Sequence, residues 1–359
     1  MHNTFLSMKI RHLFRAGKAV LEERLLGRRR PLAVWIDITN RCPAGCAYCD
    51  ISKSGKKDMP LEGLLRIMDE LAAMGCVRLH LTGGDPLIRD DIGEIIGRGK
   101  GMGFLVTLSV REHFVRRRLE ALKNADMVFL SFEGLKDVHE ELKGRGSFPL
   151  LLDAFKALRE RGIRTLTTTT LTRRNREFIP FILETARNYG FVTNFQCLHY
   201  PLGAAGGGGF RREHPLAELL LDEEEHRRIG NELIALKRSG APIADSEMCL
   251  RRIFIDWEDH RAIFLPRRPP GHPPCRAGRL FCQIDVEGIV YPCGSTFERA
   301  RKELYLNALE VGMRKAFRAL PESSCAACVQ ACHVELNLLL SLNPGTIMHW
   351  CRQLIGKRI

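Results

Sequence analysis

Two hydrophobic periods alternate along the first 200 residues or so of the chain. Runs of apolar and β-branched residues, typical of buried strands, occupy 33–38, 77–82, 104–110, 127–132, 163–171 and 191–198. Between them, apolar residues recur every three to four positions, as in amphipathic helices, over 60–74, 88–101, 112–123, 147–161 and 175–189. Repeated alternation of strand and helix predicts a parallel sheet. We therefore expect an α/β fold built on a partial (β/α)6 TIM-type barrel.

A different pattern precedes the first strand. Over 4–30, apolar residues recur at helical steps with Lys and Arg between them, and Arg28, Arg29 and Arg30 follow. This predicts a basic amphipathic helix. Such a helix could lie on an anionic membrane surface, or it could pack against the barrel with a solvated basic face.

Two stretches interrupt the pattern after the sixth strand. The glycine-rich segment over 201–215 lacks the Gly-Lys-Ser/Thr ending of a phosphate loop and is interpreted as a mobile lid or linker. A charged helix is expected over 222–239, and "PRRPPGHPP" at 266–274 indicates a boundary. We therefore divide the chain into an N-terminal helix (1–30), a barrel (31–240), a linker (241–274) and a cysteine-rich small domain (275–359).

Composition limits the function classes. The chain has 359 residues, of which 45% are apolar and 27% charged, as in globular proteins. No apolar run approaches the ~20 residues of a membrane span, and no signal peptide is recognisable. We expect a cytoplasmic protein, with peripheral contact at the inner face of the membrane as a further option. The net charge of +13 suits an anionic partner, but aromatic residues make up only 7% and no nucleic-acid-binding motif occurs, so no nucleic acid is expected.

Clustered cysteines carry the strongest chemical signal. In "TNRCPAGCAYCD", Cys42, Cys46 and Cys49 follow the first predicted strand directly. Clustered thiols in a cytosolic protein more often hold metal than form disulfides. Three thiolates on a four-iron cluster would leave one iron open for a substrate. Zinc is the competing metal, but a closed zinc site needs a fourth nearby ligand, and none is close in sequence.

This motif resembles that of the radical S-adenosylmethionine (radical SAM) superfamily in spacing, in position and in the aromatic Tyr48 before the last cysteine. A second match is "LTGGDPL" at the end of the second strand, where Gly83, Gly84 and Asp85 stand in place of the family's Gly-Gly-Glu. The resemblance implies that Tyr48 packs near the SAM adenine, and that the backbone and acid of the glycine turn contact the SAM amino group.

A third match is "LSFEGLKDVHEELKGRGSF" at 130–148. By resemblance, Ser131 helps to bind SAM, and Lys143 stands where an Arg is expected, with Arg145 as a substitute. Lys lacks the planar bidentate fork of Arg. The resemblance also implies a [4Fe-4S] cluster whose open iron binds SAM, reductive SAM cleavage to a 5′-deoxyadenosyl radical, hydrogen abstraction from a substrate, and a reductant such as flavodoxin or ferredoxin.

The C-terminal part carries a second set of cysteines: Cys275, Cys282, Cys293, Cys325, Cys328 and Cys332, with Cys351 later. "IDVEGIVYPC" predicts a hairpin that ends at Cys293. The set resembles the SPASM/twitch extension of radical SAM proteins, which implies at least one auxiliary iron–sulfur cluster; a closed zinc site is the alternative. Sulfatase-maturing relatives have an Asp base directly after the cysteine matching Cys293, whereas this chain has Gly294.

These observations favour a radical SAM enzyme acting on an unidentified substrate. The basic N-terminal helix tilts this main hypothesis slightly towards a lipid or another membrane-associated molecule. The alternative is a SPASM-type enzyme that modifies a peptide or protein. From another class, a non-catalytic iron–sulfur carrier or sensor is considered, but three rather than four cysteines at the first site argue against it, because a carrier needs no open iron.

Overall fold

The computed structural model of the chain describes residues 2–47, 49, 51–198, 215–294, 302–323 and 325–355. Its centre is a curved sheet of eight strands in the order β6-β5-β4-β3-β2-β1-β8-β9. The first six strands pair in parallel, each with its neighbour in sequence. They are β1 (Ala33–Thr39), β2 (Arg78–Gly83), β3 (Leu105–Ser109), β4 (Met127–Ser131), β5 (Thr165–Leu171) and β6 (Val192–Cys197). The predicted strands and the α/β barrel fold are confirmed.

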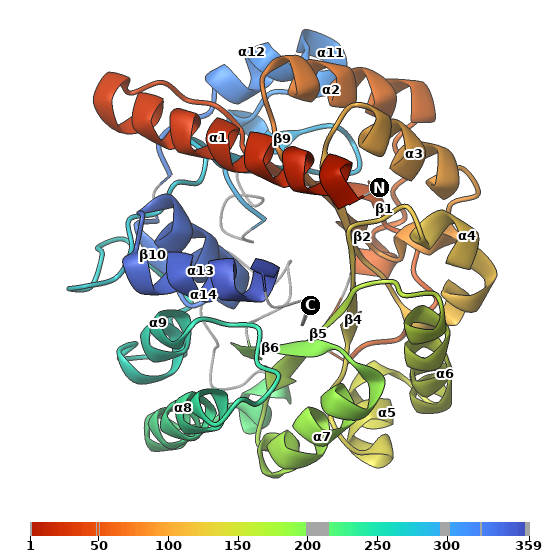
Figure 1. Cartoon of the computed structure of the whole chain (residues 1–359), viewed down its shortest axis with the longest axis vertical. Coiled ribbons are helices and arrows are strands. Elements are labelled where there is room, and N and C mark those ends of the chain that lie inside the picture. The colour runs from red at the N-terminus through yellow and green to blue at the C-terminus, as the bar shows by residue number, and fades with distance from the viewer. Residues whose placement is uncertain are drawn as a thin grey trace.

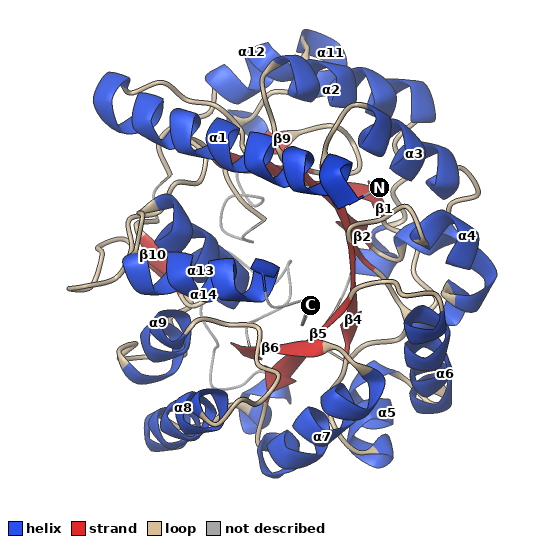
Figure 2. Cartoon of the chain, in the orientation of Figure 1, coloured by secondary structure: helices blue, strands red, loops and turns tan. Residues whose placement is uncertain are grey.

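Alternation along each strand decides what faces the barrel interior. In β1, Val34, Ile36 and Ile38 are fully buried in the core between sheet and helices, while Trp35 and Asp37 point to the other face. The sheet curves inside a ring of helices (Figures 1 and 2). The inner face can therefore carry polar chemistry, while the outer face supplies the hydrophobic core.

The covering helices mostly match the periodicity. They are α2 (Leu61–Ala73), α3 (Ile92–Gly101), α4 (Leu119–Leu122), α5 (Lys136–Lys143), α6 (Ser147–Glu160), α7 (Ile179–Tyr189) and α8 (Glu223–Arg238). The predicted helix over 112–123 is instead two 3-10 turns followed by the short α4. Helix α5 was not predicted because its sequence, KDVHEELK, offers only two apolar side chains.

The C-terminal region extends the same sheet. Strand β8 (Phe281–Ile284) pairs in parallel with β1, and β9 (Val290–Tyr291) pairs with β8 as the predicted antiparallel hairpin. The remaining elements are α9 (Glu247–Leu250), β7 (Phe264–Leu265), α11 (Ala308–Val311), α12 (Met313–Arg318), β10 (Ala327–Cys328), α13 (Ala331–Leu340) and α14 (Pro344–Ile355). One sheet therefore contains strands from both sides of residue 275, where the small domain was predicted to begin. The division into domains stays a prediction. The glycine-rich stretch lies almost wholly outside the described residues.

Helix α1 (His2–Leu26) covers the amino-terminal ends of the strands (Figure 1). The His12 ring lies 2.8 Å from the carbonyl of Gly103, before β3. Ala19 and Val20 pack in a small core with residues that flank β1 and β8. Glu23, almost fully buried, accepts hydrogen bonds from arginines of the C-terminal region. Among the described residues, no helix is long and apolar enough to cross a bilayer.

Candidate active site

The first cysteine motif forms a loop at the carboxyl end of β1. Cys42, Cys46 and Cys49 are all partly exposed, and the Cys49 amide donates to the Cys46 carbonyl at 3.2 Å. The Ala47 amide donates to the Leu142 carbonyl at the end of α5 (3.0 Å), which attaches the loop to the barrel. Burial raises the pKa of Cys42 to about 11, so binding a metal there requires displacement of a proton.

The glycine turn after β2 is bonded directly to the end of β1. The Gly84 amide donates to the Thr39 carbonyl (2.7 Å), and the Asp85 amide donates to the Arg41 carbonyl (2.8 Å). A Cβ on Gly83, whose φ is +118°, would lie 2.0 Å from the Thr39 oxygen, and one on Gly84 would lie 2.1 Å from the Arg41 oxygen. The glycines are therefore required by the approach of two backbones, and this approach places the turn beside the cysteine loop.

Asp85 is completely buried in this turn. Its Oδ1 accepts a hydrogen bond from the Leu87 amide at 3.1 Å, whereas its Oδ2 has no partner among the described residues. Burial raises the pKa of this carboxyl to about 6. A buried carboxylate oxygen without a donor is costly unless a ligand supplies one, and the ammonium group of SAM is a donor of that kind.

The other predicted SAM-binding residues differ in their surroundings. Ser131 ends β4, partly exposed, with no hydrogen-bond partner for its hydroxyl among the described residues. Lys143, by contrast, lies 2.9 Å from Glu133 Oε1 in an ion pair whose side chains are 4% and 0% exposed. Its amine therefore already has a carboxylate partner, and its contact with SAM stays a prediction. Tyr48 lies outside the described residues.

Arg111 is a candidate that the motifs did not indicate. It follows β3, is 7% exposed, and its guanidinium donates to Glu112 at 3.0 Å. Its positive charge lowers the pKa of both Cys42 and Asp85. Burial raises both pKa values by more, so the net shift of each is upward. Arg111 is thus a cation beside the cysteine loop that, like Lys143, already has a carboxylate partner, and its contact with SAM is a proposal. A basic residue just after a predicted parallel strand was the signal available in the sequence.

The donors at this end of the barrel fit the implied cofactors. Three partly exposed thiols occupy one loop, and a buried carboxylate and a buried guanidinium lie beside it. Thiolates suit iron, and the two opposite charges match the ammonium and carboxylate of an amino acid. The residues that we expect to hold a cluster and SAM are therefore in one place.

A second group of thiols gathers on the C-terminal extension. Cys328, in β10, is nearly fully buried, and burial raises the pKa of its thiol, with Cys275, Cys325 and Cys293 acting in the same direction. Cys275 lies before β8 and Cys293 just after β9. Three segments thus place four thiols near enough for their charges to interact, and four is the number of thiolates that holds an iron–sulfur cluster. The four sulfur atoms do not lie within 4.8 Å of one another as a closed zinc site requires.

The other two cysteines of this set lie elsewhere. Cys282 is fully buried in β8 and faces outward beside Cys76, so strand alternation turns it away from the group of four. Cys332, in the first turn of α13, is exposed and lies beside Arg78 and Cys249. The structure therefore does not bring Cys282 or Cys332 to the four-cysteine group, and their role as metal ligands stays a prediction.

Gly294 lies against the end of the Gln283 side chain, which is flexible and would have to move to make room for a larger residue. A Cβ at this position would lie 2.0 Å from the side-chain oxygen of Gln283, on β8. The amide of Gln283 also donates to Asp37 on the inner face of β1, at 2.8 Å. Gln283 thus occupies the space beside Cys293. The carboxylate near this point is that of Asp37 on β1, and not one from the position after Cys293.

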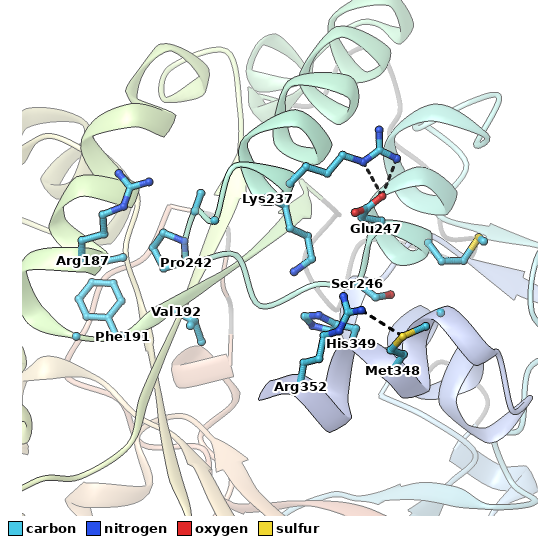
Figure 3. Close-up of a pocket in the computed structure, with 17 residues that line it drawn as sticks. Arg187, Phe191, Val192, Lys237, Pro242, Ser246, Glu247, Met348, His349 and Arg352 are labelled. Carbon is cyan, nitrogen blue, oxygen red and sulfur yellow. Dashed lines mark hydrogen bonds and ion pairs between the residues drawn. The ribbon is translucent and has the colours of Figure 1, made fainter. Parts of the chain in front are cut away.

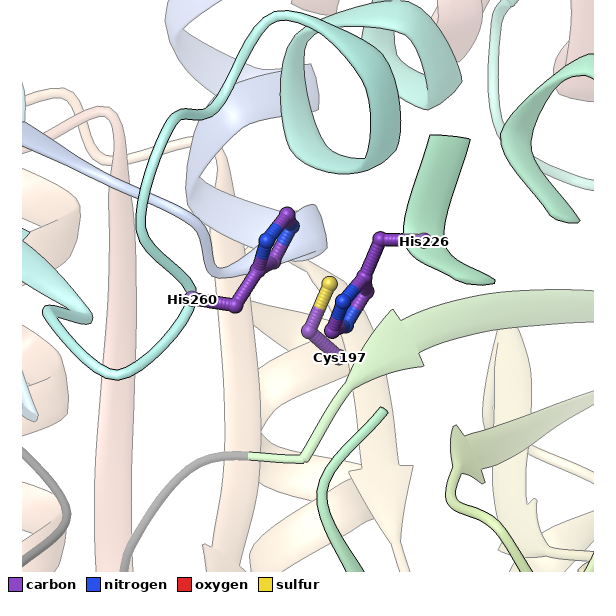
Figure 4. A group of neighbouring side chains, drawn as sticks. All are labelled: Cys197, His226 and His260. Carbon is purple, nitrogen blue, oxygen red and sulfur yellow. The ribbon is translucent and has the colours of Figure 1, made fainter. Parts of the chain in front are cut away.

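Cys197, His226 and His260 form a buried group outside the barrel, between β6 and α8 (Figure 4). The two imidazoles are parallel, with centroids 3.5 Å apart, so their lone pairs do not converge on one point. Both nitrogens of His260 also face acceptors: Glu223 at 2.6 Å and the Ile253 carbonyl at 2.7 Å. The group therefore fixes α8 to the following loop and does not form a metal site.

Comparison with known proteins agrees with this geometry. Residues 36–185 match the radical SAM superfamily. The PqqA peptide cyclase of Granulibacter bethesdensis is 30% identical over 45% of this chain and 45% of its own length, and that of Xanthomonas campestris pv. campestris is 25% identical over 76% and 71%. The chain thus spans less than half of the first relative.

Solved structures show the same fold at low identity. Streptococcus suis SuiB has a TM-score of 0.63 at 15% identity, covering 84% of this chain and 68% of SuiB. The protein anSMEcpe with bound AdoMet has a TM-score of 0.57 at 14% identity, covering 89% and 98%. Residues 36–185 thus carry a radical SAM domain, and the predicted resemblance to radical SAM enzymes is confirmed for this part of the chain.

Proposed function

We propose that this chain is a radical SAM enzyme that modifies a peptide or protein. The observation that carries the proposal is the pairing of a three-cysteine loop at the barrel mouth with a separate four-cysteine group on β8–β10. The relatives named as peptide cyclases support a peptide substrate over the lipid that the sequence first favoured. The precursor peptide SuiA, bound in one structure of SuiB, points the same way.

Each residue near the first loop has a defined task in this proposal. Cys42, Cys46 and Cys49 would hold a [4Fe-4S] cluster, which with SAM supplies hydrogen-atom abstraction by one-electron SAM cleavage. Asp85 would accept a hydrogen bond from the ammonium group of SAM at its unpartnered oxygen, and Arg111 would orient the carboxylate of SAM.

The second cysteine group would hold one auxiliary iron–sulfur cluster through Cys275, Cys293, Cys325 and Cys328. Four protein thiolates would leave it without an open position, which suits electron transfer and not substrate binding. A flavodoxin or ferredoxin would supply the electron, and the net charge of +13 favours such a donor if it is acidic.

Product analysis tests the proposal. Anaerobically reconstituted wild-type protein and the Cys46→Ala variant are incubated with SAM, dithionite and peptides encoded beside the gene. We expect 5′-deoxyadenosine and a loss of hydrogen from one peptide, seen by mass spectrometry, with wild type only. No 5′-deoxyadenosine would support the carrier hypothesis. Stimulation by a lipid extract and by none of the peptides would restore the lipid hypothesis.

We also propose that α1 contacts an anionic membrane surface. The face of α1 opposite Ala19 and Val20 exposes Phe14 (75%), Leu21 (53%) and Leu25 (77%), with the cation of Lys18 between them. The apolar residues expected to pack on the barrel are thus left in solvent, because small residues make that contact. Apolar side chains interspersed with cations suit an anionic interface.

Vesicle binding tests this contact without removing α1, whose inner face is part of the core. We expect the Phe14→Glu/Leu21→Glu variant to lose co-sedimentation with phosphatidylglycerol vesicles. The control, Leu150→Glu/Leu304→Glu, changes two leucines elsewhere that are 42% and 44% exposed and should still bind. Equal binding by both variants would contradict the proposal.

A further inference from the structure

A cavity of about 1170 Å³ lies at the end of the barrel opposite the cysteine loop (Figure 3). It is bordered by the junction of α7 and β6, by the end of α8, by the start of α9 and by α14. Val192, the first residue of β6, lines it, whereas the cysteine loop follows the last residue of β1. A ligand here would therefore not contact SAM.

Positive charge predominates in the lining. The cationic side chains are Arg187, Lys237, Arg238 and Arg352, and Glu247 is the one acidic residue. His349 also lines the cavity but is neutral near pH 7, because burial lowers its pKa to about 4. Glu247 is already neutralised, because Arg238 donates to it twice, at 2.8 and 2.9 Å. An acidic ligand would thus meet no uncompensated carboxylate in the lining.

The remaining cations keep donors available. The Lys237 amine donates to the Ile243 carbonyl at 2.8 Å, which uses one of its three N–H groups. The charges of Asp245 and Glu335, behind the lining, also act on this amine, so Arg352 is the less compensated of the two cations. Arg352 contacts the sulfur of Met348 at 3.4 Å, and a thioether is only a weak acceptor. Lys237 and Arg352 both lower the pKa of His349, after the larger effect of burial, which places both charges at one wall of the cavity.

Helix dipoles explain part of this pattern, since Arg187, Lys237 and Arg352 each lie in the last turn of a helix. The helix dipole explains why each helix ends with a cation, but it does not explain why the ends of three helices line the same cavity. Arg318 provides a comparison, because it is also an exposed cation in the last turn of a helix, α12, but does not line the cavity.

The shape and the lining indicate the kind of ligand. The volume exceeds the roughly 300–1,000 Å³ of common small-molecule pockets. Arg187 lies on the wall opposite Lys237 and Arg352 and does not converge with them on one point (Figure 3). Met348, which is 50% exposed, adds apolar surface, whereas Phe191 and Val192 border the cavity with only 4% and 5% of their surface exposed. Separated cations with apolar surface between them fit a chain with several carboxylates better than a single phosphate.

We propose that this cavity binds an acidic, partly apolar peptide segment. The inference deepens the proposed function and rests on it: the segment would belong to the substrate peptide, at a distance from the residue that reacts. Such a site would add affinity for the substrate while leaving the barrel interior free for the reacting residue.

The test uses reconstituted protein and a fluorescein-labelled peptide of alternating glutamate and leucine, followed by fluorescence anisotropy. We expect the matched glutamine peptide to bind at least tenfold more weakly. Arg352→Ala and Lys237→Met should each weaken binding of the acidic peptide about three- to tenfold at low salt, and less at high salt. Arg318→Ala should leave it unchanged. Arg352 is exposed, so its variant is expected to fold even where the Lys237 variant does not.

Three outcomes would overturn the inference: equal binding of both peptides, equal loss in Arg318→Ala and Arg352→Ala, or displacement of the peptide by low millimolar inorganic phosphate. The failures of the two proposals are separable. Formation of 5′-deoxyadenosine is measured in the same preparations and should persist in the Arg352 variant. A wild-type enzyme that modifies its peptide but does not bind the acidic probe contradicts only this inference.

Discussion

The buried pair of Lys143 and Glu133 yields a quantitative prediction, because the sequence assigned Lys143 to SAM whereas the structure gives it a carboxylate partner. The Lys143→Met variant removes one member of a pair whose side chains are 4% and 0% exposed. Loss of one partner from a buried pair costs about 3–5 kcal/mol. Glu133 keeps a hydrogen bond from the Thr170 amide at 3.0 Å, so we expect the lower end, about 3 kcal/mol.

For a chain of this length, that free-energy loss corresponds to a decrease of about 4 °C in Tm. The Lys143→Met/Glu133→Gln variant removes both charges and keeps the hydrogen-bonding capacity of position 133, so it should recover at least half of the loss. Circular dichroism at one scan rate measures all three proteins, and equilibrium dialysis measures SAM affinity. The double variant should bind SAM within about threefold of wild type, a difference below 1 kcal/mol. An unchanged Tm in Lys143→Met together with lost SAM binding would refute the structural role and restore the sequence-based one.

Three further predictions follow from single positions. Gly84→Ala should abolish SAM cleavage or soluble expression, because its Cβ would lie 2.1 Å from the Arg41 oxygen; activity at the wild-type level would contradict this close approach of the two backbones. Cys328→Ala should lose about one cluster's iron in a ferrozine assay, whereas Cys282→Ala should lose none; equal losses would place Cys282 among the ligands. Burial lowers the pKa of His226 to about 3. Below about pH 6.5 this histidine therefore binds a proton in the unfolded chain but not in the native state. The difference lowers the free energy of unfolding by about 2 kcal/mol at pH 5. The His226→Phe variant should lose less Tm than wild type between pH 7.5 and 5, and parallel losses would refute this.

The sequence predicted the barrel well because strand and helix periods are local properties. The motif residues Cys42, Cys46 and Asp85 also come together as predicted, since carboxyl ends of neighbouring parallel strands share one edge of the sheet. The sequence did not show why Gly83 and Gly84 are glycines. The backbone at the end of β1 requires them, through a contact between segments about 40 residues apart in sequence.

Other features depended on contacts that no local pattern records. The spacing around Cys282 resembles that of a ligand, but its position in β8 turns it outward beside Cys76. The sequence left open whether helix α1 lies on a membrane surface or packs against the barrel; in the structure it packs on the barrel through Ala19 and Val20 and exposes Phe14. Which face of an amphipathic helix meets the barrel is decided by the partner surface, and that surface is assembled from distant segments.

Electron paramagnetic resonance of the reduced, anaerobically reconstituted protein tests the central claim most directly. We predict that the wild-type protein shows a [4Fe-4S] signal that changes on addition of SAM, and that the Cys46→Ala variant loses this SAM-sensitive component while keeping the signal of a cluster at the four-cysteine group. A cluster signal that does not respond to SAM, or a SAM response that persists without Cys46, would contradict an open iron held by Cys42, Cys46 and Cys49.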